Sequence, residues 1–150
     1  MKRARKWGTV AGLLLALAFG ALARKDETLE QLKARADAPN LEERINVCLD
    51  IAEREANNAD QFYTKGDVEQ GRAAVDDVAS YSEKARDAAT QSGKKLKTAE
   101  ITVRKMAKKL RDMKRTLAFE DQGPVQAAVD RLESVRSDLL ARMFGKDKKK

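Results

Sequence analysis

Ten basic side chains crowd into residues 94–115, a segment with only two acidic ones, Glu100 and Asp112. Their net charge of +8 is the strongest local charge outside the first residues of the chain. Such a segment predicts either a solvated helix face or a binding surface for an anion, which can be an acidic protein, lipid headgroups or an acidic envelope polymer. The candidate residues are Lys94, Lys95, Lys97, Arg104, Lys105, Lys108, Lys109, Arg111, Lys114 and Arg115.

Groups suited to catalysis are scarce. The chain has no histidine, which is the commonest general base and metal ligand, and a single cysteine. The adjacent acids Glu42-Glu43 and Asp76-Asp77 point about 100° apart on a helix, so neither pair shares a site. Phosphate-binding glycine loops, nucleophile elbows and metal-ligand spacings do not occur. We therefore predict a protein that is not an enzyme and that uses no cofactor, metal or small-molecule substrate.

The first 23 residues have the three-part layout of a bacterial signal peptide. A basic segment, 1–7, precedes an apolar run, 10–22, and the small residues Ala21 and Ala23 stand where a signal peptidase reads. The run is shorter than the roughly 20 residues that span a bilayer. We expect cleavage after Ala23 and a periplasmic or extracellular protein; the alternative is an inner-membrane anchor formed by residues 8–23.

Charge is divided between the two halves of the expected mature chain. Residues 24–90 carry a net charge of −6 and residues 91–145 carry +6, while the tail 146–150 adds +3 and is expected to be disordered. This asymmetry favours an electrostatic match within the chain or between copies, or an anionic partner for the second half. Cys48 is predicted to be a small buried hydrophobe, with an intermolecular disulfide or redox-sensing thiol as the alternative.

Glycine and proline fall almost entirely at expected joints, which indicates an all-α chain. We predict a short helix over 26–36 capped by Asp26, and a second over 41–65 capped by Asn40 with Glu43 in a capping-box position. The segment 120–124 is predicted to be a joint, with Pro124 in the first turn of a last helix over 124–144.

Between these helices, small and apolar residues recur at steps of three and four for seven heptads, as in coiled-coil seams. The seam comprises Val68, Gly71, Val75, Val78, Ser82, Ala85, Ala89, Ser92, Leu96, Ala99, Val103, Met106, Leu110, Met113 and Leu117. Because its register passes Gly93 undisturbed, we favour one long helix over 67–119, with a bend or break at Gly93 left open. The predicted fold is a single helical domain, 24–145, of antiparallel hairpins; the alternative is a compact four-helix bundle.

These observations predict an exported helical interaction or scaffold protein of the bacterial cell envelope, which binds a protein partner or itself through apolar seams and oppositely charged halves. One alternative is a holdase-type chaperone, since the chain is similar to small basic periplasmic chaperones in size, signal and helical composition. Another is a peripheral binder of anionic membrane or envelope polymer through 94–115. Nucleic acid is disfavoured by the export signal, by the scarcity of aromatic residues among the basic ones and by the neutral sum of 24–145.

Overall fold

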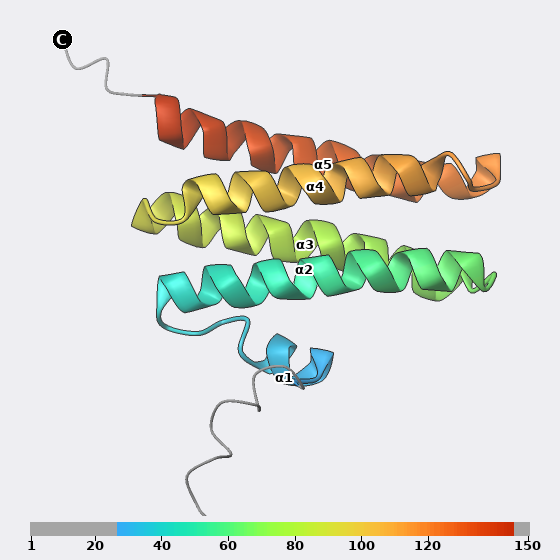
Figure 1. The fold of residues 1–150 in the computed structure, drawn as a ribbon, viewed down its shortest axis with the longest axis horizontal. Helices are drawn as coiled ribbons and strands as arrows, with labels where there is room; N and C mark the ends of the chain where they lie inside the picture. Colours follow the sequence, from blue (N-terminus) through green and yellow to red (C-terminus); the bar gives the residue numbers. More distant parts are fainter. Residues whose placement is uncertain (1–26, 146–150) are drawn as a thin grey trace, which may run out of the picture.

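The structure, a computed structural model, describes residues 27–145. In chain order they form α1 (Leu29–Ala34), α2 (Leu41–Thr64), α3 (Val68–Ser92), α4 (Leu96–Lys114) and α5 (Phe119–Phe144) (Figure 1). No strand occurs in this part of the chain, which confirms the all-α class, and none of its five helices is long and apolar enough to cross a membrane. The predicted signal peptide with Ala21 and Ala23, the predicted cap Asp26 and the basic tail 146–150 lie outside the described residues.

The first hairpin, α2 with α3, follows the sequence closely. α2 begins after Asn40, whose side-chain oxygen accepts a hydrogen bond from the backbone N–H of Glu43 at 3.0 Å. Only this half of the expected capping pair forms, because the carboxylate of Glu43 pairs with Arg35 instead. Gly66 turns the chain with a φ of +80°, and Asp67 caps α3.

The predicted long helix over 67–119 does not form, because the chain reverses direction at Gly93. The φ of Gly93 is +70°, in the left-handed region where glycine has no Cβ to clash, and its N–H donates to the carbonyl of Ala89 at 2.8 Å. Lys95 also has a positive φ, of 56°, so α4 begins after a three-residue turn. The alternative expectation, four long helices with a break at Gly93, is the one that the chain adopts.

The seam residues, whose regular spacing suggested one long helix, form the buried faces of two helices, α3 and α4. Seam members on both sides of the turn, such as Val78 and Ala85 before it and Val103 and Leu110 after it, are inaccessible to solvent. α3 and α4 bury these residues against one core, so the spacing continues across the turn although the helix does not.

The last helix begins at Phe119, five residues before Pro124, so the predicted joint at 120–124 is wrong. The chain turns over 115–118 instead, where the hydroxyl and the backbone N–H of Thr116 both donate to the carbonyl of Met113. Pro124 lies in the second turn of α5 and has no N–H for the carbonyl four residues earlier. That carbonyl belongs to an exposed residue, Glu120, so water can replace the missing donor.

The first helix is shorter than predicted and ends at Ala34 rather than at residue 36. Thr28 caps it in a complete capping box with Gln31: the Gln31 N–H donates to the threonine hydroxyl at 3.2 Å, and the Thr28 N–H donates to the glutamine side chain at 2.9 Å. Leu32 and Ala36 are almost fully buried, so this segment covers part of the core beside α2.

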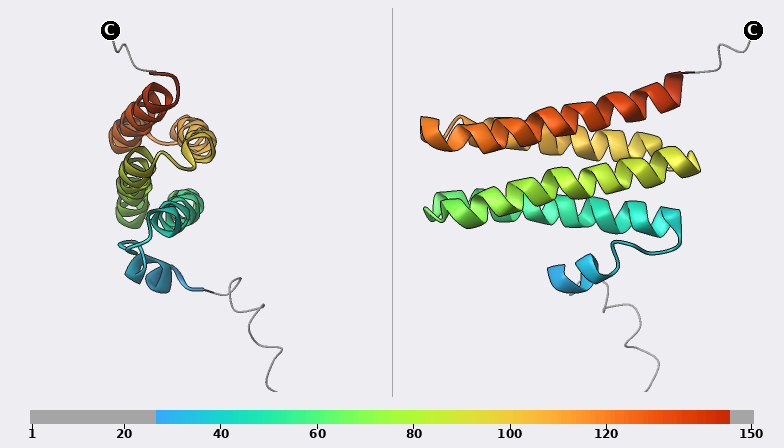
Figure 2. Two further views of the ribbon diagram at one scale, coloured as in Figure 1. Left: turned by 90° about the vertical axis from the view of Figure 1, so that its left-hand side faces the viewer. Right: turned by 180° about the vertical axis from the view of Figure 1, so that it is seen from behind.

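The four long helices form two hairpins, α2–α3 and α4–α5, stacked side by side. Seen end-on, α1, α3 and α5 form one layer, and α2 and α4 form the other (Figure 2). Cross-contacts between α2 and α4 join residues 49 or 52 positions apart, and those between α3 and α5 join residues 48 to 55 apart. The second hairpin therefore lies parallel to the first at an offset of about fifty residues.

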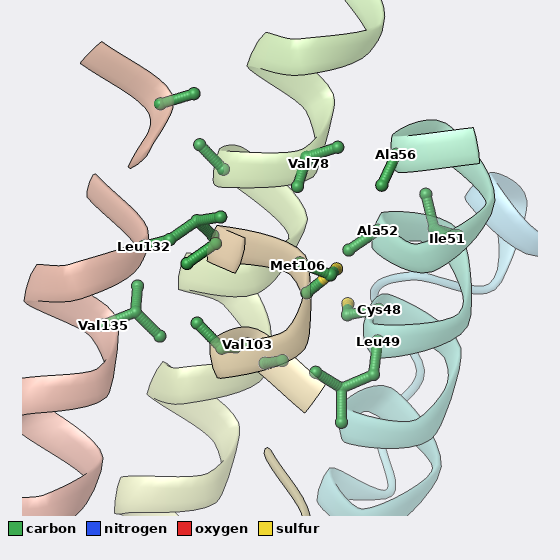
Figure 3. Close-up of a cluster of buried hydrophobic side chains, with 14 of the residues drawn as sticks. Cys48, Leu49, Ile51, Ala52, Ala56, Val78, Val103, Met106, Leu132 and Val135 are labelled. Atoms are coloured by element: carbon green, nitrogen blue, oxygen red, sulfur yellow. The ribbon is translucent and has the colours of Figure 1, made fainter. Parts of the chain in front are cut away.

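One cluster of buried apolar side chains extends through both hairpins. Figure 3 shows side chains from α2, α3, α4 and α5 meeting in it, with Met106 of α4 directed toward Ala52 and Cys48 of α2. α2 packs most extensively on α3, and α4 on α5, as the hairpin prediction requires. The core thus joins the hairpins into one body and leaves the outer helix faces to solvent.

Gly71, the one glycine predicted inside a helical pattern, gives room to an aromatic ring. A Cβ at this position would lie 2.9 Å from the ring carbons of Tyr63, well inside van der Waals contact. Tyr63 is partly buried, and its hydroxyl is enclosed without a hydrogen-bond partner in the described structure. The glycine therefore lets the tyrosine ring lie directly against the backbone of α3.

Candidate interaction surface

Five of the ten predicted basic residues lie together on the solvent side of α4. We call this the α4 outer face: Lys97, Arg104, Lys105, Lys108 and Arg115, all of which are exposed. Their spacings of one, three, four and seven place them on the side of the helix opposite the buried seam. Half of the predicted basic residues are therefore exposed along one side of α4.

The other five are directed at neighbouring helices. Lys94 lies 3.4 Å from the carboxylate of Glu42, Lys95 donates to Asn46 at 2.9 Å, and Lys109 donates to Asn57, all on α2. On the opposite side, Arg111 pairs with Glu133 of α5 at 2.7 Å and Lys114 donates to Gln126. These five side chains contact α2 or α5, and of them Lys94 and Lys95 remain exposed to solvent.

Charge on the α4 outer face is only partly neutralised. Asp112 accepts from Lys108 at 2.6 Å and lies 3.6 Å from Arg115, and the hydrogen bond from Lys108 lowers the pKa of the Asp112 carboxyl. Arg104 stands 3.9 Å from Glu100, a long ion pair. Lys97 and Lys105 make no ion pair or side-chain hydrogen bond with any residue of 27–145, so they are available to an external anion.

A shallow groove between α4 and α2 adjoins this face and has walls of opposite charge. Lys105 and Lys109 stand on the α4 side, and Glu53 and Asp60 on the α2 side. Buried methionine and alanine side chains form its floor, namely Met106, Met113 and Ala56. Acidic and basic side chains are thus presented side by side on the layer that α2 and α4 form.

The two adjacent pairs of acids diverge as expected, and each carboxylate has its own cation. Glu42 pairs with Lys94 and Glu43 with Arg35. Asp76 pairs with Arg131 and Asp77 with Lys33. Within residues 27–145, no group of three or more histidine, cysteine, aspartate or glutamate side chains is placed to hold a metal ion.

Lys33 of α1 forms a partly buried ion-pair cluster that the sequence did not suggest. Its ammonium lies 2.8 Å from Glu55 of α2 and 2.6 Å from Asp77 of α3, and Glu55 is only 5% exposed. Burial opposes the charged form, but the hydrogen bonds to Asp77 and Glu55 outweigh it and raise the pKa of Lys33. No local pattern signals this contact, because its partners are 22 and 44 residues away in the chain.

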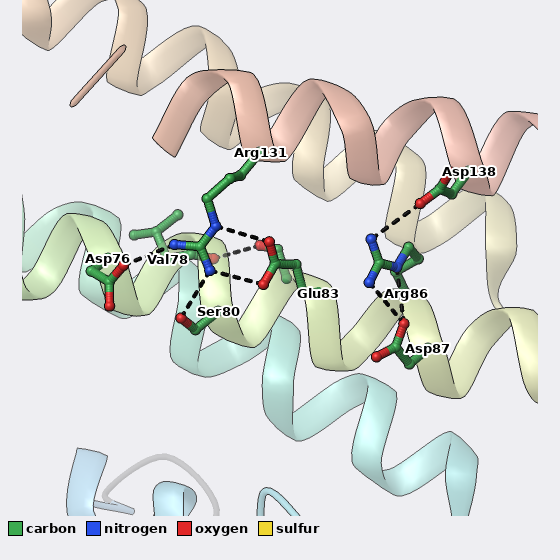
Figure 4. A network of polar contacts seen from close by, with 9 residues as sticks. Asp76, Val78, Ser80, Glu83, Arg86, Asp87, Arg131 and Asp138 are labelled. Carbon is green, nitrogen blue, oxygen red and sulfur yellow. Dashed lines mark hydrogen bonds and ion pairs between the residues drawn. The ribbon is translucent and has the colours of Figure 1, made fainter. Parts of the chain in front are cut away.

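Arginines on α5 and α3 form a second network, which fastens the two hairpins together (Figure 4). Arg131 donates to both carboxylate oxygens of Glu83, at 2.9 and 2.8 Å, and to Asp76 at 2.8 Å. A second ion pair has its cation on α3 and its anion on α5: Arg86 lies 3.1 Å from Asp138. Ion pairs thus join the acidic first half to the basic second half in both directions, so much of the charge asymmetry is matched within the chain.

Cys48 lies in the core and is fully inaccessible to solvent. Its Sγ lies 3.5 Å from the carbonyl of Ala36, and burial raises the pKa of the thiol to about 11. The thiolate that disulfide exchange requires is therefore strongly disfavoured in the folded protein.

The α4 outer face is the part of the described surface best suited to recognising another molecule, since its charge is concentrated and incompletely paired. Its ammonium and guanidinium groups attract anions. Comparison of the chain with protein-family models, with curated proteins and with solved structures gives no match.

Proposed function

We propose that the protein is an exported, non-catalytic interaction protein of the bacterial cell envelope that binds an acidic protein through the α4 outer face. The observation that carries this proposal is the pair of exposed lysines, Lys97 and Lys105, which have no anionic partner within residues 27–145. An external carboxylate can pair with such an ammonium group without breaking an existing ion pair. They therefore favour electrostatic attraction of an acidic surface.

The neighbouring acidic wall favours a protein partner over an anionic membrane. Glu53 and Asp60 face the same side of the molecule as Lys105, across the shallow groove. A uniformly anionic bilayer would be attracted by Lys105 and repelled by these two carboxylates. A protein can place carboxylates opposite α4 and cations opposite α2, so it can complement both walls.

The exposed apolar surface gives the chaperone alternative less support. Phe119 and Phe144 are the only large hydrophobic side chains of residues 27–145 that are exposed, and they lie at opposite ends of α5. An unfolded client offers mainly apolar segments, which require a continuous apolar surface rather than two separate side chains.

A direct test measures binding of a glutamate-rich peptide by the protein, by its Lys105→Glu variant and by a matched control, Lys65→Glu. Lys65 is exposed at the end of α2, so both substitutions change the net charge equally. We expect binding that weakens with salt, since exposed charges are screened over about 8 Å at physiological ionic strength. Binding should be lost in Lys105→Glu and kept in Lys65→Glu.

Three results would overturn the proposal. Equal loss in both variants would show that net charge, and not the α4 outer face, is recognised. Stronger binding to anionic vesicles than to the peptide would establish the membrane alternative. Suppression of the aggregation of an unfolded outer-membrane protein, tested in the same samples, would establish the chaperone alternative.

Export is proposed from residues 1–23 and is tested separately. In a bacterial host we expect the periplasmic fraction to contain a protein whose N-terminus is Arg24. Substituting arginine for Ala23 should leave a longer, membrane-associated precursor, because signal peptidases require a small residue there. Recovery of full-length protein from the cytosol would exclude an envelope function.

A further inference from the structure

The outer face of α5 has no partner in the described structure. α5 packs on α3 and α4, and its opposite side is exposed from end to end. We call this side the α5 outer face: Phe119, Gly123, Ala127, Asp130, Ser134, Ser137, Ala141 and Phe144. Phe119 and Phe144 are 88% and 76% exposed.

The order of residue types along this face is symmetric about its middle. The 26 residues of α5 extend about 39 Å, with a phenylalanine at each end and small side chains between. The one charged member, Asp130, lies near the centre. Small side chains allow two helices to approach closely, and a terminal phenylalanine can then cover each end of the contact.

We propose that the α5 outer face binds the same face of a second copy, with the two α5 helices antiparallel about a two-fold axis level with Leu132. This arrangement places Phe119 beside the partner's Phe144 and Ala127 beside the partner's Ser137. Asp130 then faces the partner's Ser134, whose hydroxyl can donate to the carboxylate. Every contact occurs twice, as an isologous interface requires.

Charge favours the antiparallel pairing over a parallel one. Glu120 lies at the N-terminal end of α5 and Arg142 at the C-terminal end, both exposed on one flank of the face, and the Nε of Arg142 also donates to the carbonyl of Thr90 on α3. The antiparallel arrangement brings Glu120 beside the partner's Arg142 at both ends. A parallel pair would instead set Asp130 against the partner's Asp130, where like charges repel, and would leave Glu120 and the partner's Arg142 at opposite ends of the contact.

The expected dimer is weak and depends on concentration. A contact confined to one pair of helices falls near the lower end of the roughly 1,200–2,000 Å² that stable interfaces bury. None of its residues belongs to the α4 outer face, so the proposal does not depend on the acidic partner proposed above.

Cysteine cross-linking tests the geometry. Chains with Ala127→Cys, mixed with chains with Ser137→Cys, should form a disulfide-linked pair, because these positions face each other across the axis. Neither variant should cross-link with itself, since position 127 lies about 15 Å along the axis from the partner's position 127. The buried Cys48 does not compete in the folded protein.

Sedimentation equilibrium tests the association itself. Ala127→Glu should raise the dissociation constant of the dimer about tenfold or more. Gln61→Glu makes the same change of charge at an exposed position of α2 and should leave the dissociation constant unchanged. A monomer at all concentrations in the unsubstituted protein would overturn the proposal. So would self-cross-linking of the single cysteine variants, or equal association of Ala127→Glu and Gln61→Glu.

Discussion

The guanidinium of Arg136 on α5 donates two hydrogen bonds to one carboxylate oxygen of Glu100 on α4, at 3.0 and 3.1 Å. The side chain of Glu100 is only 8% exposed. A carboxylate at this depth needs such a partner, because an unpaired buried charge is costly. The pair therefore fixes how α4 and α5 face each other within the second hairpin.

Replacing Glu100 by alanine should destabilise the protein by about 1.5–3 kcal/mol, the range for hydrogen bonds to charged groups. Arg136 keeps its contact with Glu133 at 2.8 Å, so the loss should not exceed that range. Urea unfolding of the variant measures it, with Glu53→Ala, an exposed carboxylate on α2, as control. Equal stability of both variants would show that the buried pair contributes nothing.

Gly71→Ala should destabilise the protein by about 1–3 kcal/mol, as overpacking does, because the new methyl group would lie 2.9 Å from the ring of Tyr63. Gly123→Ala is the matched control: it lies in α5 and, its chain neighbours aside, has nothing within 4 Å of its added Cβ. That variant should change the stability by less than about 1 kcal/mol, because the gain in helix propensity is opposed by the clash between the new Cβ and the ring of Pro124. Thermal melts lowered equally in both variants would contradict the packing described for Tyr63.

Gly93→Ala distinguishes the observed turn from a continuous helix by the sign of its effect. In the left-handed conformation, alanine costs about 1–2 kcal/mol. In a continuous helix the same substitution would instead stabilise by about 1 kcal/mol. We expect destabilisation by denaturant unfolding, and a gain in stability for Lys95→Gly, whose backbone also has a positive φ.

Cys48 should resist thiol reagents in the native protein. Its pKa of about 11 and its complete burial leave almost no reactive thiolate at neutral pH. The thiol should be titrated by Ellman's reagent only after urea has unfolded the chain. Fast labelling without denaturant, or a disulfide-linked dimer under oxidising conditions, would support the redox alternative instead.

Stability should fall in acid as the carboxylates between the helices are protonated. Hydrogen bonds from Arg131 lower the pKa of Glu83, and those from Arg111 lower the pKa of Glu133, below the unfolded value of 4.5. Below pH 4.5 the unfolded chain binds more protons than the folded one, so the free energy of unfolding decreases as pH falls. Chemical unfolding at several pH values checks this, and Glu83→Gln should flatten the decline.

Local patterns in the sequence predicted the hairpins well. Asn40 caps its helix as expected, since a cap depends only on residues within one turn. The periodicity of the seam identified its buried residues, because a helix packed on a core buries apolar residues at steps of three and four. It did not determine whether Gly93 continues or reverses the chain, since both alternatives bury the same face.

The directions of the basic side chains could be predicted only in part. The sequence identified ten basic residues but not the directions of their side chains. Arg111 and Lys114 contact Glu133 and Gln126 of α5. The contact of Lys33 with Asp77 depends on where α1 docks, which no local spacing determines. The face of α5 was missed because its small residues form no pattern of charge or hydropathy until the helix is known to begin at Phe119.

The fifty-residue offset between the stacked hairpins bears on the order in which the chain folds. Contacts within a hairpin close short loops near Gly66 or residues 115–118. The contacts of α2 with α4 and of α3 with α5 close about fifty residues and lose more chain entropy. We therefore expect each hairpin to collapse early and docking through Arg131 and Arg86 to come late. In native-state hydrogen exchange, amides at the hairpin–hairpin boundary should open together as one cooperative unit.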